Sequence, residues 1–309
     1  MSLPRSTVRR FVPSACAAVM VAVCAASVQP ANAVSPPEAS TRPSAPDSNA
    51  AANAWANATL RAMTLEQKVG QLFVVTVWGK SADGADQKNQ AAYGVDTPAQ
   101  VVERYQVGGV IYFNNSGTDN VDDPQQLAAF SNGLQRAAMG SGARVPLTIA
   151  TDQEGGTVTR VVTPATESPG NMALGAGRSA ADAHSLAAVV GKELRAMGIN
   201  QDFAPDADVN SNPLNPVIGV RSFSARPDLA SELVSAQVAG YERSGPAART
   251  VAATAKHFPG HGDAATDSHT GLPVISRSEQ EWHEIDMPPF AAAIDAGITH
   301  LDLAPSYGD

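Results

Sequence analysis

Short apolar runs alternate with helical patterns along most of the chain. The first of six such runs, QLFVVTV, is apolar and rich in β-branched residues, which is typical of a buried strand. The predicted strands are residues 71–77, 107–113, 146–152, 199–209, 250–258 and 298–304. Near-continuous apolar strands separated by helices are typical of a parallel sheet covered by helices, so the pattern predicts an α/β fold.

Polar residues at the predicted helix starts support this alternation. Thr64 and Gln67 have the spacing of a capping box, in which each side chain accepts a hydrogen bond from the other residue's backbone. Thr97 precedes Pro98, and Asp123 precedes Pro124, so each of these two helices would begin with proline in its first turn. The other predicted helices are residues 179–197, 227–243 and a helical stretch from Ser278 that leads into Gly297.

The alternation alone fits both a doubly wound sheet and a (β/α)8 barrel of the TIM type. The positions of the polar residues favour the barrel. Asp152, Asp206, Lys256 and His257 each follow the apolar part of a predicted strand, and a barrel gathers its active site at the carboxyl ends of several strands. No glycine-rich phosphate loop follows the first strand, so a dinucleotide-binding sheet has less support.

The first 33 residues have the pattern of an export signal. Arg5, Arg9 and Arg10 precede an apolar run, and Ala31-Asn32-Ala33 is a small-residue cleavage pattern. The apolar run is short and weakly apolar for a membrane span. We therefore expect a secreted or extracytoplasmic protein that is cleaved after Ala33 and has no membrane span in its mature form; a lipoprotein is a less favoured alternative.

Composition divides the remainder into a linker and one domain. Residues 34–50 are rich in Pro, Ser and Ala, which predicts a disordered linker, and residues 51–309 form the predicted barrel domain. The leader holds both cysteines, so the mature chain has no thiol with which to form a disulfide or a thiolate metal site. Loss of its three Arg changes the formal net charge from −9 to −12, which argues against nucleic acid as a partner.

Residues 256–272, KHFPGHGDAATDSHTGL, concentrate titratable groups on an irregular segment. Three interpretations are open: an ordered connection whose polar groups satisfy one another, a metal site, or an acid/base site. A metal site has less support because the segment lacks a helical HExxH frame. Asp267 and His269 are two residues apart, so the carboxylate can orient the imidazole and raise its pKa. The acid/base interpretation is therefore the best supported.

The same segment, extended to Ile275, resembles the signature of glycoside hydrolase family 3, in the branch of the β-N-acetylglucosaminidases (β-hexosaminidases). Three further segments resemble family motifs in the right order: TDQEGGTVTR (151–160), INQDFAPDADVN (199–210) and VIGVRSFS (217–224). The resemblance covers residues 65–296 and implies the family's barrel.

The resemblance also implies roles for individual residues. His269 is the general acid/base and Asp267 orients it, in place of the carboxylic acid that other branches use. Asp152 holds sugar hydroxyls, and the other sugar-pocket residues are Arg160, Arg221, Lys256 and His257.

The end of the sequence departs from the family pattern. The family's nucleophilic Asp follows the seventh strand, and the sequence ends at Asp309, just past the sixth predicted strand. We therefore expect an incomplete barrel with about six of eight βα units and leave the nucleophile unidentified. The last 16 or so residues resemble an aldo-keto reductase segment, with its catalytic residues at Asp302 and Tyr307. We do not assign Asp302 as the glycosidase nucleophile.

Together these features predict a retaining hydrolase of terminal β-linked N-acetylglucosamine in cell-wall or chitin-derived oligosaccharides, with no cofactor and no metal. A non-catalytic sugar-binding remnant would bind sugar without turnover. An aldo-keto-reductase-like oxidoreductase would bind NADPH, and a metal hydrolase would be sensitive to chelators. The sequence leaves open the aglycone, water or phosphate as the acceptor, and the oligomeric state.

Overall fold

The structure, a computed structural model, describes residues 48–114 and 118–304, with side chains from residue 50 onward. The predicted leader lies outside the described residues, as does the linker up to residue 47. The first described helix, α1 (Ser48–Ala62), begins within the range assigned to the linker. In the described part of the chain, no helix combines the length and the apolar character needed to cross a bilayer.

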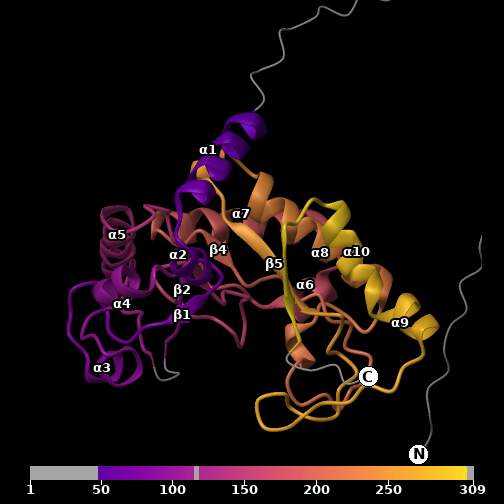
Figure 1. The fold of residues 1–309 in the computed structure, drawn as a ribbon. Coiled ribbons are helices and arrows are strands. Elements are labelled where there is room, and N and C mark those ends of the chain that lie inside the picture. The colour runs from indigo at the N-terminus through magenta and orange to yellow at the C-terminus, as the bar shows by residue number, and fades with distance from the viewer. Residues whose placement is uncertain (1–47, 115–117, 305–309) are drawn as a thin grey trace, which may run out of the picture. The chain divides into compact units, whose positions relative to one another are not determined.

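Six parallel strands form one sheet in which every strand pairs with its neighbours in the sequence (Figure 1). The strands are β1 (Val74–Thr76), β2 (Gly109–Tyr112), β3 (Thr148–Thr151), β4 (Gln201–Asp202), β5 (Ala252–Phe258) and β6 (His300–Leu303). This sequential order is the order of a barrel, whereas a doubly wound sheet reverses its strand order at a switch point. The predicted barrel architecture is therefore confirmed for six strands, with β1 and β6 at the two edges.

The helices after α1 lie between successive strands, except for α2, which precedes β1. They are α2 (Leu65–Gly70), α3 (Gln87–Tyr93), α4 (Pro98–Tyr105), α5 (Pro124–Gly140), α6 (Asn171–Gly177), α7 (Ala180–Ala196), α8 (Pro227–Arg243), α9 (Glu279–Ile285) and α10 (Met287–Asp295). Two single turns of 3₁₀ helix are η1 (Gly219–Arg221) and η2 (Ala247–Arg249). Helix α8 packs against α7, α10 and β5, and its buried positions recur every three or four residues, as expected for one apolar face.

The predicted caps are present. Thr64 and Gln67 form the capping box of α2, Thr97 and Gln100 form that of α4, and the Asp123 side chain caps α5. Each cap satisfies backbone N–H groups that have no partner inside the helix. The predicted starts of these helices are therefore confirmed.

Several elements differ from their predictions. The strand predicted at 199–209 pairs only over Gln201–Asp202, which is β4. The strand predicted at 71–77 pairs over Val74–Thr76 alone, because β1 is an edge strand with a single neighbour, and Leu72 before it is 82% exposed. The helical stretch after Ser278 is two helices, α9 and α10, because Pro288 and Pro289 have no N–H with which to continue the first one. The short helices α3 and α6 were not predicted, since neither has a clear apolar periodicity.

Candidate active site

One cavity of about 710 Å³ lies where the carboxyl ends of β3, β5 and β6 meet the loops that follow β4 and β5. Six of the seven predicted site residues line it: Asp152, Arg160, Arg221, Lys256, His257 and His269. The seventh, Asp267, contacts His269 rather than the cavity. Segments more than 100 residues apart in the sequence therefore meet as the predicted barrel requires.

The end of β3 supplies three consecutive side chains with different partners. Asp152 and Glu154 line the cavity, because residues two apart on an extended chain point to the same side. Gln153 lies between them and is buried. Its amide oxygen accepts hydrogen bonds from the backbone N–H groups of Arg160 and Val161, both at 2.9 Å. Gln153 thereby folds the following loop back, so that Arg160 Nη2 lies 3.6 Å from Asp152 Oδ2.

Lys256 and Arg221 are held by carboxylates beneath the cavity. Lys256 Nζ lies 2.6 Å from Asp152 Oδ1 and 2.7 Å from Glu154 Oε1. Arg221 donates from Nε and Nη2 to the two oxygens of Glu154, both at 2.8 Å. An ammonium group has three donors, so Lys256 keeps one for a ligand in the cavity.

The charges around Glu154 favour its ionised form. Burial alone would raise the pKa of Glu154, but Lys256 and Arg221 together hold that pKa well below its usual range. Burial likewise opposes the charge on Lys256, and Glu154 and Asp152 nevertheless raise the Lys256 pKa. These groups therefore stay charged at neutral pH and offer a ligand fixed cations.

His257 is held as one neutral tautomer. Its Nδ1 lies 2.6 Å from Asp208 Oδ2, and its Nε2 lies 3.3 Å from Arg221 Nη2. The guanidinium can only donate, so Nε2 accepts and the ring proton resides on Nδ1. Burial lowers the pKa of His257 to about 4. Both ring nitrogens therefore have protein partners, and the neutral ring adds no charge to the cavity.

His269 and Asp267 form a pair on the loop between β5 and α9. Asp267 Oδ1 accepts from the backbone N–H of His269 at 2.9 Å and lies 2.7 Å from its Nδ1. The backbone and ring hydrogen bonds from His269 hold the pKa of Asp267 below its usual range. With Nδ1 donating to a carboxylate, Nε2 is the ring nitrogen that can exchange a proton with a ligand. The His269 side chain is 75% exposed, so this nitrogen is accessible.

Asp206, Asp208 and His257 also place potential metal-ligand atoms within 4.8 Å of one another. Within the described residues, however, this cluster already has internal partners. Asp208 accepts from His257 and from the backbone N–H of His261, and Arg221 Nη2 lies 3.7 Å from Asp206 Oδ2. A bound cation would have to compete with the Arg221 guanidinium, and we assign no metal site.

The aldo-keto-reductase-like alternative would use Asp302 and Tyr307 as catalytic residues. Asp302, at the end of β6, lines the same cavity. Tyr307 lies outside the described residues. The nucleophile of a retaining glycosidase is not assigned to either of them.

Several side chains of this site were not assigned roles from the sequence. Glu154 stands two positions after Asp152, so the alternation of an extended strand could have identified it. Asp208 and His261 gave no comparable signal, because their hydrogen bond joins the loops after β4 and β5. Only the tertiary structure brings those loops together.

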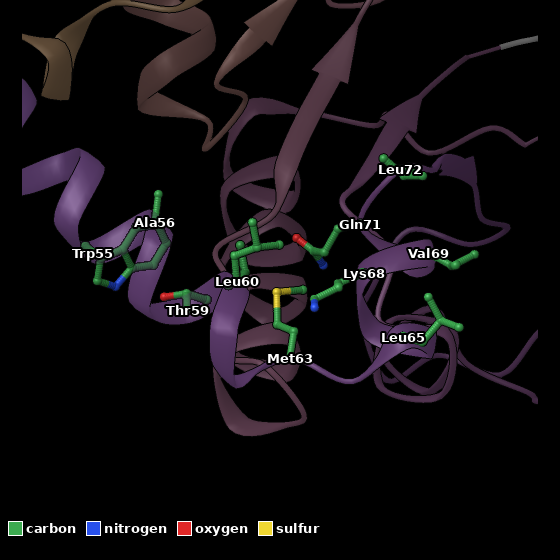
Figure 2. A pocket seen from close by; sticks show the side chains of 11 residues that line it. Trp55, Ala56, Thr59, Leu60, Met63, Leu65, Lys68, Val69, Gln71 and Leu72 are labelled. Atoms are coloured by element: carbon green, nitrogen blue, oxygen red, sulfur yellow. The ribbon is translucent and has the colours of Figure 1, made fainter.

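A second cavity, of about 530 Å³, lies between α1 and α2 (Figure 2). Trp55, Leu60 and Leu65 line it, together with Lys68, its one charged side chain. None of the seven predicted site residues contributes to it. This lining is mostly apolar and has none of the carboxylates and histidines of the first cavity, so the candidate site is the cavity at the strand ends.

Comparison with known proteins agrees with this site. Residues 64–304 match the glycosyl hydrolase family 3 N terminal domain. The chain is 44% identical over 202 residues to beta-hexosaminidase A of Pseudoalteromonas piscicida. This alignment covers 64% of this chain and 32% of that protein. It is 31% identical over 245 residues to a beta-N-acetylglucosaminidase/beta-glucosidase of Cellulomonas fimi. This second alignment covers 79% of this chain and 38% of that protein.

A solved structure shares the fold. The glycoside hydrolase family 3 beta-N-acetylglucosaminidase from Paenibacillus sp. str. FPU-7 superposes with a TM-score of 0.69 and 42% sequence identity. The alignment covers 79% of this chain and 42% of that one. The chain thus spans between about a third and two fifths of the length of these three proteins. Since the family match extends over most of the sequence and includes every element around the cavity, the chain belongs to glycosyl hydrolase family 3, whose N-terminal domain it contains.

Proposed function

We propose that this chain provides the sugar pocket and the general acid/base of a hydrolase that releases terminal β-linked N-acetylglucosamine. The observation that carries the proposal is the Asp267–His269 pair, whose imidazole lines the same cavity as Asp152, Lys256 and Arg221. The relatives named beta-hexosaminidase and beta-N-acetylglucosaminidase support this choice of sugar.

The cavity has the donors and acceptors that a sugar needs. Asp152 can accept hydrogen bonds from sugar hydroxyls, and the free donor of Lys256 can donate to them. Arg160, Arg221 and His257 complete the lining. Because the carboxylates and cations already neutralise one another, the pocket can bind a neutral sugar without leaving a buried charge unpaired.

His269 would supply the proton in the first step. As the bond between the anomeric carbon and the leaving oxygen breaks, Nε2 gives its proton to that oxygen, and Asp267 stabilises the charged ring through Nδ1. In the second step the same nitrogen takes a proton from the attacking water, which restores the imidazolium. A retaining mechanism also needs a carboxylate that attacks the anomeric carbon, and we leave that residue unassigned.

The substrate class and the location are parts of the same proposal. The export pattern of residues 1–33 supports a secreted or extracytoplasmic protein. Oligosaccharides from cell walls or chitin are the substrates that such an enzyme would meet outside the membrane.

The test compares two leaving groups. His269→Ala should lower kcat/KM about 10²- to 10⁴-fold for an alkyl β-N-acetylglucosaminide, whose leaving group must be protonated. The same variant should change cleavage of the dinitrophenyl glycoside much less, because dinitrophenolate leaves without a proton. Steady-state kinetics on the full chain measures both values.

His283→Ala is the matched control, since His283 is an exposed histidine on α9 that does not line the cavity. It should behave like the parent. Equal turnover of the alkyl glycoside by His269→Ala and the parent would refute the role of His269. Folded parent protein that binds N-acetylglucosamine but turns over neither substrate would support the sugar-binding remnant instead.

A further inference from the structure

Residues 259–277 connect β5 to α9 and carry the Asp267–His269 pair. The outgoing arm of this loop is well anchored. His261 donates its backbone N–H to Asp208 at 2.5 Å, and its carbonyl accepts from Asn215 Nδ2 at 2.8 Å. Gly262 packs so closely on residue 209 that a Cβ would lie 1.9 Å from the Val209 carbonyl oxygen. The path from β5 to Asp263 is therefore determined by the loop after β4.

The return arm has much weaker support. Residues 272–276 make no hydrogen bond to any other described residue, and Leu272 and Val274 are exposed. Pro273 is buried, so packing provides some contact. The first strong polar anchor after His269 is Arg277, just before the N-cap of α9.

Arg277 joins three parts of the structure. Its Nη2 lies 3.0 Å from Asp263 Oδ1 on the outgoing arm and also donates to Ser211 Oγ in the loop after β4. Its Nη1 lies 3.2 Å from Asp286 Oδ2, at the junction of α9 and α10. The Arg277 side chain is 10% exposed and that of Asp286 is 2% exposed, whereas that of Asp263 is 36% exposed. The guanidinium therefore joins a buried carboxylate to one that is partly exposed.

We propose that Arg277 is a positioning residue for the acid/base: by joining the return arm to the outgoing arm, it sets where His269 stands over the cavity. The inference rests on the proposed role of His269. At the tip of the loop, the side chain of His269 has no hydrogen-bonding partner but Asp267 among the described residues, and the neighbouring Ser268 reaches the outgoing arm through His261 Nε2 at 3.2 Å. The position of the imidazole therefore depends on both arms. The Ser268–His261 contact joins them near the tip, and Arg277 joins them at the end of the return arm.

This position matters for proton transfer and little for sugar binding. Lys256 is held by Asp152 and Glu154, and Arg221 is held by Glu154. None of these contacts involves Arg277. A misplacement of the acid by about 1 Å can lower the rate about 10²-fold. Loss of Arg277 should thus reproduce the selective defect of a missing acid and leave the sugar pocket intact.

The first measurement is the leaving-group dependence of Arg277→Met in the full chain. We expect kcat/KM for the alkyl β-N-acetylglucosaminide to fall about 30- to 100-fold, and that for the dinitrophenyl glycoside to fall less than about threefold. The inhibition constant of N-acetylglucosamine should stay within about twofold. Arg277→Lys, which can still contact one carboxylate, should fall between Arg277→Met and the parent.

A general loss of structure would not give this result, because it would lower both rates and weaken sugar binding together. Equal losses on the two substrates, or no loss on either, would overturn the proposal. If Arg277→Met does not fold, Asp263→Ala removes the contact on the outgoing arm and keeps the pair with Asp286. It should show the same selectivity with a smaller loss, and equal losses on the two substrates would again overturn the proposal.

Hydrogen exchange separates this inference from the proposed function. In Arg277→Met, the hydrogen-bonded amides of this loop, which are those of Ala264, His269, Thr270 and Gly271, should exchange faster. The amides of β3 and β5 should keep the rates of the parent. Unchanged exchange in this segment would refute the anchoring whether or not the protein is active. If the parent itself turns over neither substrate, the function fails while the anchoring remains measurable by exchange.

Discussion

At the scale of single residues, Glu154 occupies the centre of the charge network. It is 3% exposed, and its two oxygens accept from Lys256 and Arg221. Asp152 contacts Lys256 from the cavity side, whereas Glu154 fixes both cations from beneath. Glu154 therefore affects a substrate through Lys256 and Arg221, the two cations that it orients.

Glu154→Gln should therefore impair both stability and binding. Removal of one partner of a buried ion pair typically costs about 3–5 kcal/mol of the free energy of unfolding, because the remaining charge is left uncompensated. We also expect KM to rise about tenfold or more, since the free donors of Lys256 and Arg221 lose their fixed direction. Denaturant unfolding and steady-state kinetics measure the two effects.

Glu103→Gln is the matched control, because Glu103 is an exposed glutamate on α4. It should leave stability and KM unchanged. Parent-like stability and KM in Glu154→Gln would mean that the cations do not depend on this carboxylate.

At the scale of elements, the loops after β4 and β5 fit together through backbone contacts as well as side chains. Gly262 is the closest of these contacts, with no room for a methyl group against the Val209 carbonyl. The neighbouring His261 N–H points to Asp208. The spacing of glycines in PGHG therefore has a packing reason beyond turn formation.

Gly262→Ala should force the two loops apart. The clash is with backbone, which cannot rotate away, and such overpacking typically costs about 1–3 kcal/mol of stability. Because the shift displaces the arm that leads to His269, kcat/KM for the alkyl glycoside should fall more than about tenfold. Gly245→Ala is the control: its added Cβ would meet no atom closer than 4.0 Å, and it should behave like the parent in thermal unfolding and kinetics.

At the scale of the whole molecule, the fold buries acids that favour their protonated forms. Burial raises the pKa of Asp202, inside β4, to about 7, although its Oδ1 accepts from the Gln153 N–H at 2.8 Å. In the unfolded chain an aspartate has a pKa of about 3.9. Between these two values the unfolded state releases a proton that the folded state retains, so stability falls as the pH rises.

Asp202→Asn should make this decline shallower. The Asn amide oxygen can still accept the hydrogen bond from the Gln153 N–H, but the side chain cannot ionise. Between pH 4.5 and 6.5 the free energy of unfolding should therefore fall less steeply with rising pH, by up to about 1.4 kcal/mol per pH unit. Urea unfolding at several pH values measures the slope. Asp228→Asn is the control, because Asp228 is exposed and its hydrogen bond with Arg226 lowers its pKa, so any effect lies below pH 4. An unchanged slope in Asp202→Asn would show that this carboxyl is ionised in the folded state.

The sequence by itself determined the order of the elements and the residue types of the site. Capping boxes such as Thr97–Gln100 and apolar runs such as 107–113 are local features, and local interactions suffice to predict the helix starts and the positions of the strands along the chain. The DSH segment likewise brings Asp267 and His269 together within three residues, so their pairing needed no knowledge of the fold. The family resemblance indicated the sugar-pocket residues without saying what holds them.

The tertiary structure decided the contacts between distant segments. Glu154 joins Arg221 and Lys256, and Arg277 joins Asp263 and Asp286, because the loops at the strand ends converge in three dimensions. Pairing across a parallel sheet depends on register and loop path, which no local pattern encodes. For the same reason only the fold could show that the Arg277 guanidinium joins the return arm of the acid/base loop to the outgoing arm.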